Sequence, residues 1–374
     1  MTAAGMNLAI TGWGVVSAIG AGVDEFSAGV LAGHDGAKTT NGQSAGFPVA
    51  KACHIPEFDP AKHLGKKGTR FLDRTTTFAV VASGMALESS GIAVTPDNQN
   101  RIGVVLGTST GSIKSITDFT RDTLVQEKPY FVNPLLFPNT VMNCAAGQVA
   151  IWHKLKGVNA TVSGGHLSSL LALRYAAIKL QLGSADALVT GGTEEFCEQM
   201  AWGFYHSVPA VRDGSVLLGE GCVMVILERA EVALRAGRRI LARLLACEAG
   251  VAAPDKGVAG RTQALSDCVR RALTAADTSP ESCWAAAVHR CGDEELEQAE
   301  NAAVRDVFGS DHRLRSIDTS KLAGECFSAS GAFQLASLLA LFRDGPEDAA
   351  RTALLISTGR GGRVGCAVVR EERL

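Results

Sequence analysis

Histidine and cysteine are the residue types in this chain best suited to nucleophilic, acid–base or metal chemistry. The sequence holds eight histidines and ten cysteines. No two histidines have the H-x-x-x-H spacing that places two ligands on one helix face, and no cysteines form a C-x-x-C pair. Glycine-rich runs at Gly107 and Gly191 lack the nucleotide-binding patterns, which favours tight turns there. Residue spacing alone therefore predicts no metal site and no nucleotide cofactor.

Alternating strands and helices must position these side chains, and hydrophobic periodicity locates them. In the first half we expect strands at residues 8–10, 102–106, 187–189 and 223–227, with helices at 23–31, 71–91, 167–182 and 231–236. The run Thr11–Gly14 has two glycines and is typical of a turn. The second half repeats the pattern, with strands at 240–249, 285–289, 352–356 and 364–369 and helices at 265–276, 294–308 and 331–342. Two successive halves, 1–237 and 238–374, predict a pseudo-duplicated α/β fold.

Length and composition agree with a layered α/β protein. The chain has 374 residues, 46% of them hydrophobic, which is enough to bury a large core. A net charge of −2 with interspersed signs lacks the basic stripe that nucleic-acid binding needs. We find no signal peptide, and no apolar run reaches the roughly 18 residues of a membrane span. The scattered cysteines predict reduced thiols and a cytoplasmic protein.

Several local motifs, taken in their order and spacing, resemble the β-ketoacyl-acyl-carrier-protein synthase family of the thiolase-like superfamily. The similar stretches extend over almost the whole chain and comprise residues 10–20, 72–74, 137–150, 156–163, 212–214 and 218–221. The resemblance implies a five-layered α-β-α-β-α architecture and dimers whose pockets lie near the two-fold interface. It also implies acyl carrier protein as a partner, with phosphopantetheine carried by that partner and no cofactor bound to this chain.

The nucleophilic cysteine of the family, in a pattern like T-A-C-S-S-S-L at a helix start, falls on His166. In relatives this cysteine takes an acyl group from a carrier-protein thioester, and the helix N-terminus stabilises its thiolate. Residues 163–170 contain no cysteine here. We interpret His166 either as a neutral or hydrogen-bonded plug, or as a base or transient nucleophile. Acyl-imidazoles hydrolyse readily, so a histidine would store an acyl chain poorly.

The two histidines of the family fall on His289 and Glu325. His289 is retained at a predicted strand end, where it could keep residual chemistry or be a buried, hydrogen-bonded side chain. An anion at Glu325 opposes the enolate charge that develops during condensation. Glu325 could instead form an ion pair with protonated His166 or His289, or activate a water as in a hydrolase. The family's lysine is not clearly kept, because Lys321 lies one position from the expected place.

Arg360, Thr358 and Cys144 are further candidates for substrate binding. Arg360 replaces the aromatic gate of the family pattern G-F-G-G-T-N. It could plug the pocket, pair with Glu325, or recognise an anionic group such as a phosphopantetheine phosphate or a carboxylate. Cys144 could be a displaced nucleophile, although a small buried cysteine is the commoner case.

Three functional hypotheses follow from these replacements. The leading one is a chain-length-factor-like partner that forms a heterodimer with an active β-ketoacyl synthase of type II fatty acid or polyketide biosynthesis. The second is an active acyltransferase, malonyl-thioester decarboxylase or thioester hydrolase that uses His166, His289 and Glu325. The third is a homodimeric carrier-protein or acyl-binding module without catalysis. An isolated heterodimer subunit should leave a large apolar face exposed.

Overall fold

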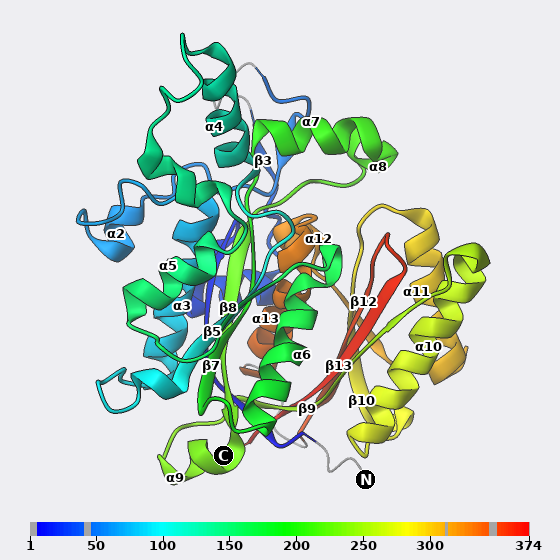
Figure 1. The fold of residues 1–374 in the computed structure, drawn as a ribbon. Helices are drawn as coiled ribbons and strands as arrows, with labels where there is room; N and C mark the ends of the chain where they lie inside the picture. Colours follow the sequence, from blue (N-terminus) through cyan, green and yellow to red (C-terminus); the bar gives the residue numbers. More distant parts are fainter. Residues whose placement is uncertain (1–5, 41–45, 311–312, 344–349, 374) are drawn as a thin grey trace.

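The computed structural model describes residues 6–40, 46–310, 313–343 and 350–373, and its centre is a continuous mixed β-sheet (Figure 1). The first half contributes β1 (Leu8–Ser17), β5 (Ile102–Gly107), β6 (Asn159–Val162), β7 (Ala187–Glu194) and β8 (Gly221–Arg229). The second half contributes β9 (Ala242–Val251), β10 (Cys283–Val288), β11 (Arg315–Asp318), β12 (Thr352–Thr358) and β13 (Arg363–Glu371). The halves meet where β1 pairs with β9.

The two halves share one strand topology. Their spatial orders are β6-β5-β7-β8-β1 and β11-β10-β12-β13-β9. When the five main strands of each half are counted along the chain, both orders read 3-2-4-5-1. The pairing directions also agree, because the first two pairs in each order are parallel and the last two are antiparallel. This repeat is the pseudo-duplication expected from the sequence, while the boundary near residue 237 stays a prediction.

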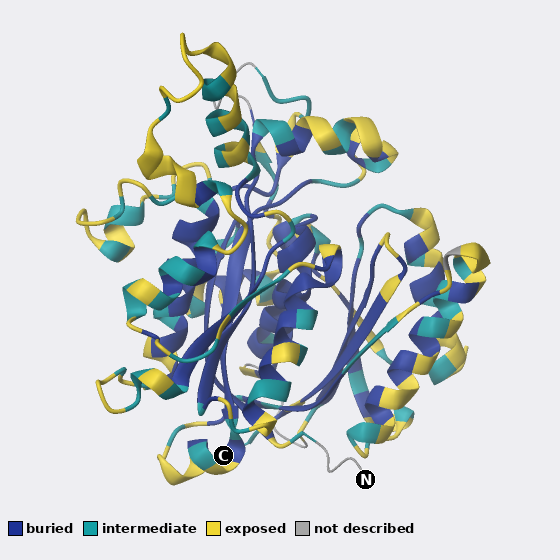
Figure 2. Cartoon of the chain, viewed as in Figure 1, coloured by how far each residue is buried: buried dark blue, intermediate teal, exposed yellow. Residues whose placement is uncertain are grey.

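Helices complete five layers around the two half-sheets. Helices α3 (Arg74–Ser90) and α5 (Cys144–His153) cover the first half-sheet, and α10 (Gly257–Ala275) and α11 (Glu294–Phe308) cover the second (Figure 1). Between the half-sheets lie α6 (Ser168–Gln181) and α13 (Ser330–Arg343). Figure 2 shows α13 and much of α6 buried, whereas α10 and α11 have exposed outward faces; α3 is also mostly buried. The predicted α-β-α-β-α architecture is confirmed.

Shorter elements and additional helices surround this framework. They are α1 (Val23–Ala32), α2 (Pro60–Leu64), α4 (Ile113–Val125), α7 (Glu198–Ser207), α8 (Pro209–Arg212), α9 (Ala230–Arg235), α12 (Ser320–Ala323) and the two-residue strands β2 (Gly20–Ala21), β3 (Lys38–Thr39) and β4 (Lys51–Ala52). Across the ranges that the structure describes, no helix has both the length and the apolar character needed to cross a membrane.

Local signals explain where the long helices begin and end. The side chain of Asp73 accepts a hydrogen bond from the Thr76 N–H at the start of α3, and Gly91 adopts a left-handed conformation at its end. At the start of α11, Asp293 accepts from the Leu296 N–H in the same way. The predicted helix at 294–308 matches α11 at both ends.

The turns predicted at Thr11–Gly14 and at Gly191 are wrong, because both segments are buried strand. These glycines allow backbones to approach closely. A Cβ on Gly14 would lie 2.2 Å from the Ala82 carbonyl oxygen in α3, and one on Gly191 would lie 1.9 Å from the Val223 carbonyl oxygen in β8. The run that begins at Gly107 differs: Gly107 ends β5 against Ser168 at the start of α6, and the chain then bends through residues 109–111, where Gly111 has a φ of 73°, so the turn expected in this run is present.

We expect Gly14→Ala to lower the free energy of unfolding by at least about 1–3 kcal/mol, because the new methyl group would overlap backbone atoms of α3 that cannot rotate away. Urea denaturation monitored by circular dichroism measures the loss. Gly147→Ala is the matched control: Gly147 lies inside α5 with open space at its Cβ position. That variant should be about as stable as the parent or up to about 1 kcal/mol more stable. Equal losses in both variants would contradict the close-approach explanation.

Candidate active site

His166 lies at the entrance of the central helix α6. It occupies the 3₁₀ turn η3 (Gly165–Leu167), which Gly165 enters with a positive φ of 62°. Ser168 fixes this turn, since its hydroxyl donates to the Gly165 carbonyl oxygen at 2.7 Å and accepts from the Gly164 N–H at 3.0 Å. The imidazole is therefore held at the helix start, where it is 7% exposed.

Glu325 joins the two histidines that are far apart in the sequence. His289 follows β10, and Glu325 follows α12. The His289 Nε2 lies 2.9 Å from Glu325 Oε2, and the His166 Nε2 lies 3.8 Å from Glu325 Oε1. The two imidazole ring centroids are 4.8 Å apart. The three positions singled out from the sequence thus form one buried cluster, here called the His–His–Glu cluster.

The charges in this cluster follow from burial and from the short contact. Burial lowers the pKa of His166 to about 4, so this imidazole is neutral at pH 7. Burial alone would also lower the pKa of His289, but the Glu325 carboxylate outweighs it and the pKa is raised. For Glu325, burial opposes ionisation, yet the charge of His289 brings the pKa down to about 2. At neutral pH the cluster is thus a His289–Glu325 ion pair beside a neutral His166.

Phe327 and Ser330 hold the Glu325 carboxylate, and sequence reasoning missed both. The Phe327 N–H and the Ser330 hydroxyl donate to Glu325 Oε1 at 2.6 and 3.1 Å. The Phe327 ring stacks on His166 with centroids 5.5 Å apart, and on Phe204 at 4.0 Å. Phe327 has a φ of 41°, a left-handed conformation that side-chain-bearing residues rarely adopt. No residue pattern signals that conformation, so the sequence offered no means of finding this contact.

The backbone of Glu325 is hydrogen-bonded to Leu217 and to Gly219, which lies in the 218–221 stretch of the family resemblance. The Glu325 N–H donates to the Leu217 carbonyl oxygen at 2.8 Å, and the Gly219 N–H donates to the Glu325 carbonyl oxygen at 2.9 Å. A Cβ on Gly219 would lie 1.7 Å from the Ala323 carbonyl oxygen, so only glycine fits this approach. The 218–221 stretch therefore helps to position Glu325.

Arg360 pairs with Asp293 and not with Glu325. The Arg360 Nε lies 3.3 Å from an Asp293 carboxylate oxygen, and the Arg261 guanidinium donates to the neighbouring Gly359 carbonyl oxygen at 3.1 Å. The suggested pairing of Arg360 with Glu325 is thus wrong, because Asp293 at the start of α11 offers a closer carboxylate. Lys321 is exposed, and its side chain is not part of the His–His–Glu cluster.

Thr358 and Cys144 lie in different surroundings. Thr358 ends β12, is 1% exposed, and its backbone helps to raise the pKa of His289. Cys144 starts α5, and its thiol lies 3.6 Å from the Asn139 side-chain oxygen. Burial and the nearby Asp73 charge raise the pKa of Cys144, which opposes a role as a nucleophile. All ten thiols have raised pKa values caused first by burial.

A cavity of about 270 Å³ opens onto His166. Its walls are mostly apolar, although Arg360 and Arg363, at the turn between β12 and β13, also line it. The other lining residues are Ser109, Thr110, Ile113, Gly164, Gly165, Met200, Phe204, Phe327, Gly359 and Gly361. The cavity volume fits a short acyl group or a narrow polar chain and is too small for a large substrate.

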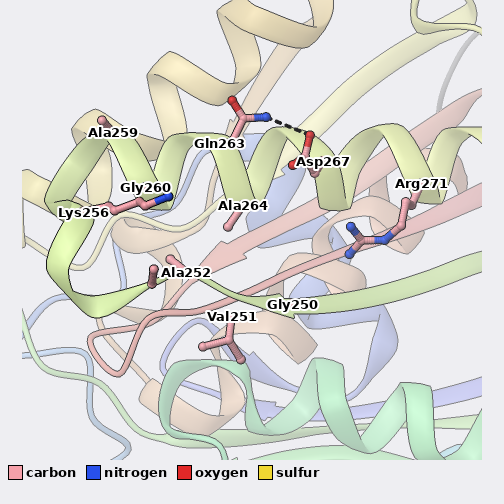
Figure 3. Close-up of a pocket in the computed structure, with 11 residues that line it drawn as sticks. Gly250, Val251, Ala252, Lys256, Ala259, Gly260, Gln263, Ala264, Asp267 and Arg271 are labelled. Carbon is pink, nitrogen blue, oxygen red and sulfur yellow. Dashed lines mark hydrogen bonds between the residues drawn. The ribbon is translucent and has the colours of Figure 1, made fainter.

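A larger groove of about 620 Å³ lies elsewhere, between the end of β9 and α10 (Figure 3). Lys256 and Arg271 flank it, and Gln263 donates to Asp267 along the α10 wall at 2.9 Å. Its lining has no histidine, cysteine or serine, and none of the candidate site residues from the sequence lies in it. The smaller cavity at the His–His–Glu cluster is therefore the candidate active site.

The pKa values of His166 and His289 should be shifted in opposite directions from that of a free histidine. We expect the His166 imidazole to stay neutral down to about pH 4, and His289 to stay protonated above the usual pH of 6.5. In the unfolded chain His166 takes up its proton near pH 6.5, so lowering the pH from 6.5 to 4 favours unfolding by about 3 kcal/mol through this residue. Histidine NMR titration checks the pKa values. His166→Gln should lose that part of the acid sensitivity, and an unchanged pH dependence would contradict the assignment.

The fold is that of a thiolase-like ketosynthase. Two features define it: the strand topology repeated in the two half-sheets, and the pair of central helices between them. The buried polar cluster lies at the start of one of these helices. The model of the β-ketoacyl synthase N-terminal domain matches residues 6–233, and that of the C-terminal domain matches residues 243–346. The chain belongs to the β-ketoacyl synthase family.

Individual relatives agree with this assignment. The chain is 29% identical over 360 residues to a 3-oxoacyl-[acyl-carrier-protein] synthase 2 of Coxiella burnetii, covering 90% of this chain and 85% of that protein. It is 30% identical to the enzyme of that name from Rhizobium meliloti, with 87% and 83% covered. Among solved structures, one titled the ishigamide ketosynthase/chain length factor is 36% identical, with a TM-score of 0.85 over 98% of this chain and 100% of that one. A β-ketoacyl synthase from Burkholderia phymatum, at 21% identity and the same TM-score over 98% and 100%, shows the same fold.

Proposed function

We propose that this chain is a non-condensing, chain-length-factor-like subunit that pairs with an active β-ketoacyl synthase in type II polyketide or fatty acid biosynthesis. The observation that carries the proposal is the His–His–Glu cluster. A neutral imidazole occupies the helix start where the family places its nucleophilic thiolate, and a carboxylate occupies the place of the second histidine. The likeness to a structure whose title includes a chain length factor supports the same reading.

The charges of the cluster oppose the two steps of condensation. Acyl transfer needs a thiolate, and the buried thiols of this chain have raised pKa values. Decarboxylation of a malonyl thioester builds negative charge on an enolate, which donors must stabilise. The carboxylate of Glu325 would repel that charge. The family's scaffold is thus retained while its chemistry is not supported.

Hydrolysis through Glu325 is also disfavoured by the geometry. A general base works best with a pKa near the working pH, whereas the pKa of Glu325 is about 2. Its Oε1 accepts from Phe327 and Ser330, and its Oε2 accepts from His289. These contacts leave Glu325 a fixed counterion for His289, and we assign it that role.

An exposed apolar face supports a partner subunit. Ten large apolar side chains from the end of α4 to α5 are exposed, and we call them the 124–151 face: Leu124, Val125, Tyr130, Phe131, Leu135, Leu136, Phe137, Val141, Met142 and Ile151. So many exposed apolar side chains in one stretch of chain are typical of a protein interface. The face includes part of the 137–150 stretch, which by the family resemblance corresponds to a dimer-interface and pocket segment. We therefore assign it to contact with the active synthase.

Intact-protein mass spectrometry tests the proposal. The pure chain is mixed with malonyl-loaded and acyl-loaded carrier protein, and both proteins are weighed over time. We expect no adduct on the chain and no change in the carrier's cargo. Loss of carbon dioxide or of the acyl group, or an adduct on His166 or Cys144, would overturn the proposal in favour of an enzyme.

Co-expression with a ketosynthase that has an intact Cys-His-His set tests the pairing. It should give a heterodimer, and a stable homodimer alone would contradict the pairing.

A further inference from the structure

The His–His–Glu cluster brings together three groups that are all ligands of zinc. The ligand atoms of His166, His289 and Glu325 lie within 4.8 Å of one another, and all three side chains are buried. They come from three distant segments of the chain, which explains why the spacing of residues in the sequence gave no sign of a metal site. Two histidines and one glutamate form a known ligand set for zinc sites that keep an open position.

The ligand atoms lie near one another but not yet at the spacing of a closed site. Zinc bonds of about 2.0–2.2 Å place neighbouring ligand atoms roughly 3.3 Å apart. In the metal-free cluster His289 Nε2 lies 2.9 Å from Glu325 Oε2, His166 Nε2 lies 3.8 Å from the other oxygen, Oε1, and the three ligand atoms lie within 4.8 Å of one another. Binding one ion would therefore draw the three side chains together around one carboxylate oxygen.

The surroundings supply the outer contacts that metal ligands need. The Phe327 N–H and the Ser330 hydroxyl fix the Glu325 carboxylate, and the Phe327 ring stacks on the His166 imidazole. The nearby cation Arg360 would repel a metal ion, but its ion pair with Asp293 offsets that charge. The cavity that opens onto His166 gives an ion a route of entry.

We propose that His166, His289 and Glu325 bind one Zn²⁺ ion, with the fourth position facing the cavity and taken by water. On binding, the nitrogen lone pair of His289 forms the bond to zinc and its proton leaves to solvent. The metal thus replaces the hydrogen bond between His289 and Glu325. This inference goes beyond the proposed partner role, which is argued from the metal-free cluster, where Glu325 is the counterion of His289.

Metal titration of chelator-treated protein tests the site, with Zn²⁺ alone as the probe. Isothermal titration calorimetry should give one ion per chain, and Co²⁺ in its place should give the intense visible absorption of a four-coordinate complex. The variants His166→Gln and Glu325→Gln should each weaken binding at least about tenfold, because loss of even an outer contact costs roughly 10–100-fold in affinity. His206→Ala is the control: His206 is exposed on α7, where it stacks on Trp202 and meets Tyr205 edge to face.

The outcomes separate the cluster from surface binding. Unchanged affinity in His206→Ala together with weak binding in the two cluster variants would support the site. No stoichiometric binding by the parent protein, or parent-like binding by both cluster variants, would overturn it. Should one cluster variant fail to fold, Zn²⁺ should still raise the melting temperature of the parent and not that of the other variant. The mass spectrometry of the carrier protein described above tests the proposed partner role independently of zinc binding.

Discussion

Replacing Glu220 with alanine should lower the free energy of unfolding by about 3–5 kcal/mol, the usual cost of removing one partner of a buried ion pair. Glu220 is 1% exposed and accepts four hydrogen bonds. Two come from the Arg74 guanidinium, at 2.6 and 2.5 Å, and two from the backbone N–H groups of Ile55 and Phe196, at 2.7 and 3.1 Å. Alanine would leave the partly buried Arg74 charge without its carboxylate, and the Ile55 and Phe196 N–H groups without their acceptor.

Urea denaturation at pH 7 measures this loss, and Asp24→Ala provides the comparison. Asp24 also pairs with an arginine, Arg343, but its side chain is 86% exposed. Water takes over as the partner when such a pair is lost, so the cost should stay below about 1 kcal/mol. A small, equal effect in both variants would show that the contacts of Glu220 are not important for stability. Because Gly219 next to it supports Glu325, the Glu220→Ala variant should also loosen the candidate site.

Hydrophobic periodicity located most of the framework, and glycine was the main source of error. The helix α11 was predicted with both ends correct, and in the structure Asp293 caps its start and Gly309 follows its end. Gly12 and Gly14 suggested a turn, yet β1 runs through them because α3 packs directly on the strand. A glycine that permits a turn and one that permits close packing look alike in a sequence. Only the tertiary contact separates them.

The positions of the candidate site could be predicted, but the contacts between them could not. Family resemblance located His166, His289 and Glu325, and it also pointed to Arg360. Which carboxylate pairs with which cation depends on three-dimensional distance, and Arg360 is satisfied by Asp293. The state of His166 depends on burial, since an exposed histidine would be half protonated near pH 6.5. Neither quantity can be read from residue spacing.

The double variant His166→Cys with Glu325→His should gain a reactive thiol that the parent chain lacks. A cysteine at the start of α6 would lie where the helix N-terminus stabilises a thiolate. In the single variant His166→Cys, the Glu325 carboxylate remains beside that position, where it now contacts His166 at 3.8 Å, and it would raise the thiol pKa. Each unit of pKa changes the thiolate fraction about tenfold. We expect the double variant to react with iodoacetamide at least about ten times faster than the single variant.

The native cysteines give this measurement a low background, because burial raises the pKa of all ten thiols and Cys144 alone is partly exposed. The variant His166→Cys with Glu325→Gln is the control that removes the anion without adding a histidine. An intermediate rate would show that both the lost charge and the added imidazole contribute. Equal rates in all three variants would mean that Glu325 does not govern the chemistry at this helix start. If the double variant reacts fast and also takes an acyl group from carrier protein, these two substitutions are sufficient to give this chain the acyl-transfer step of the family.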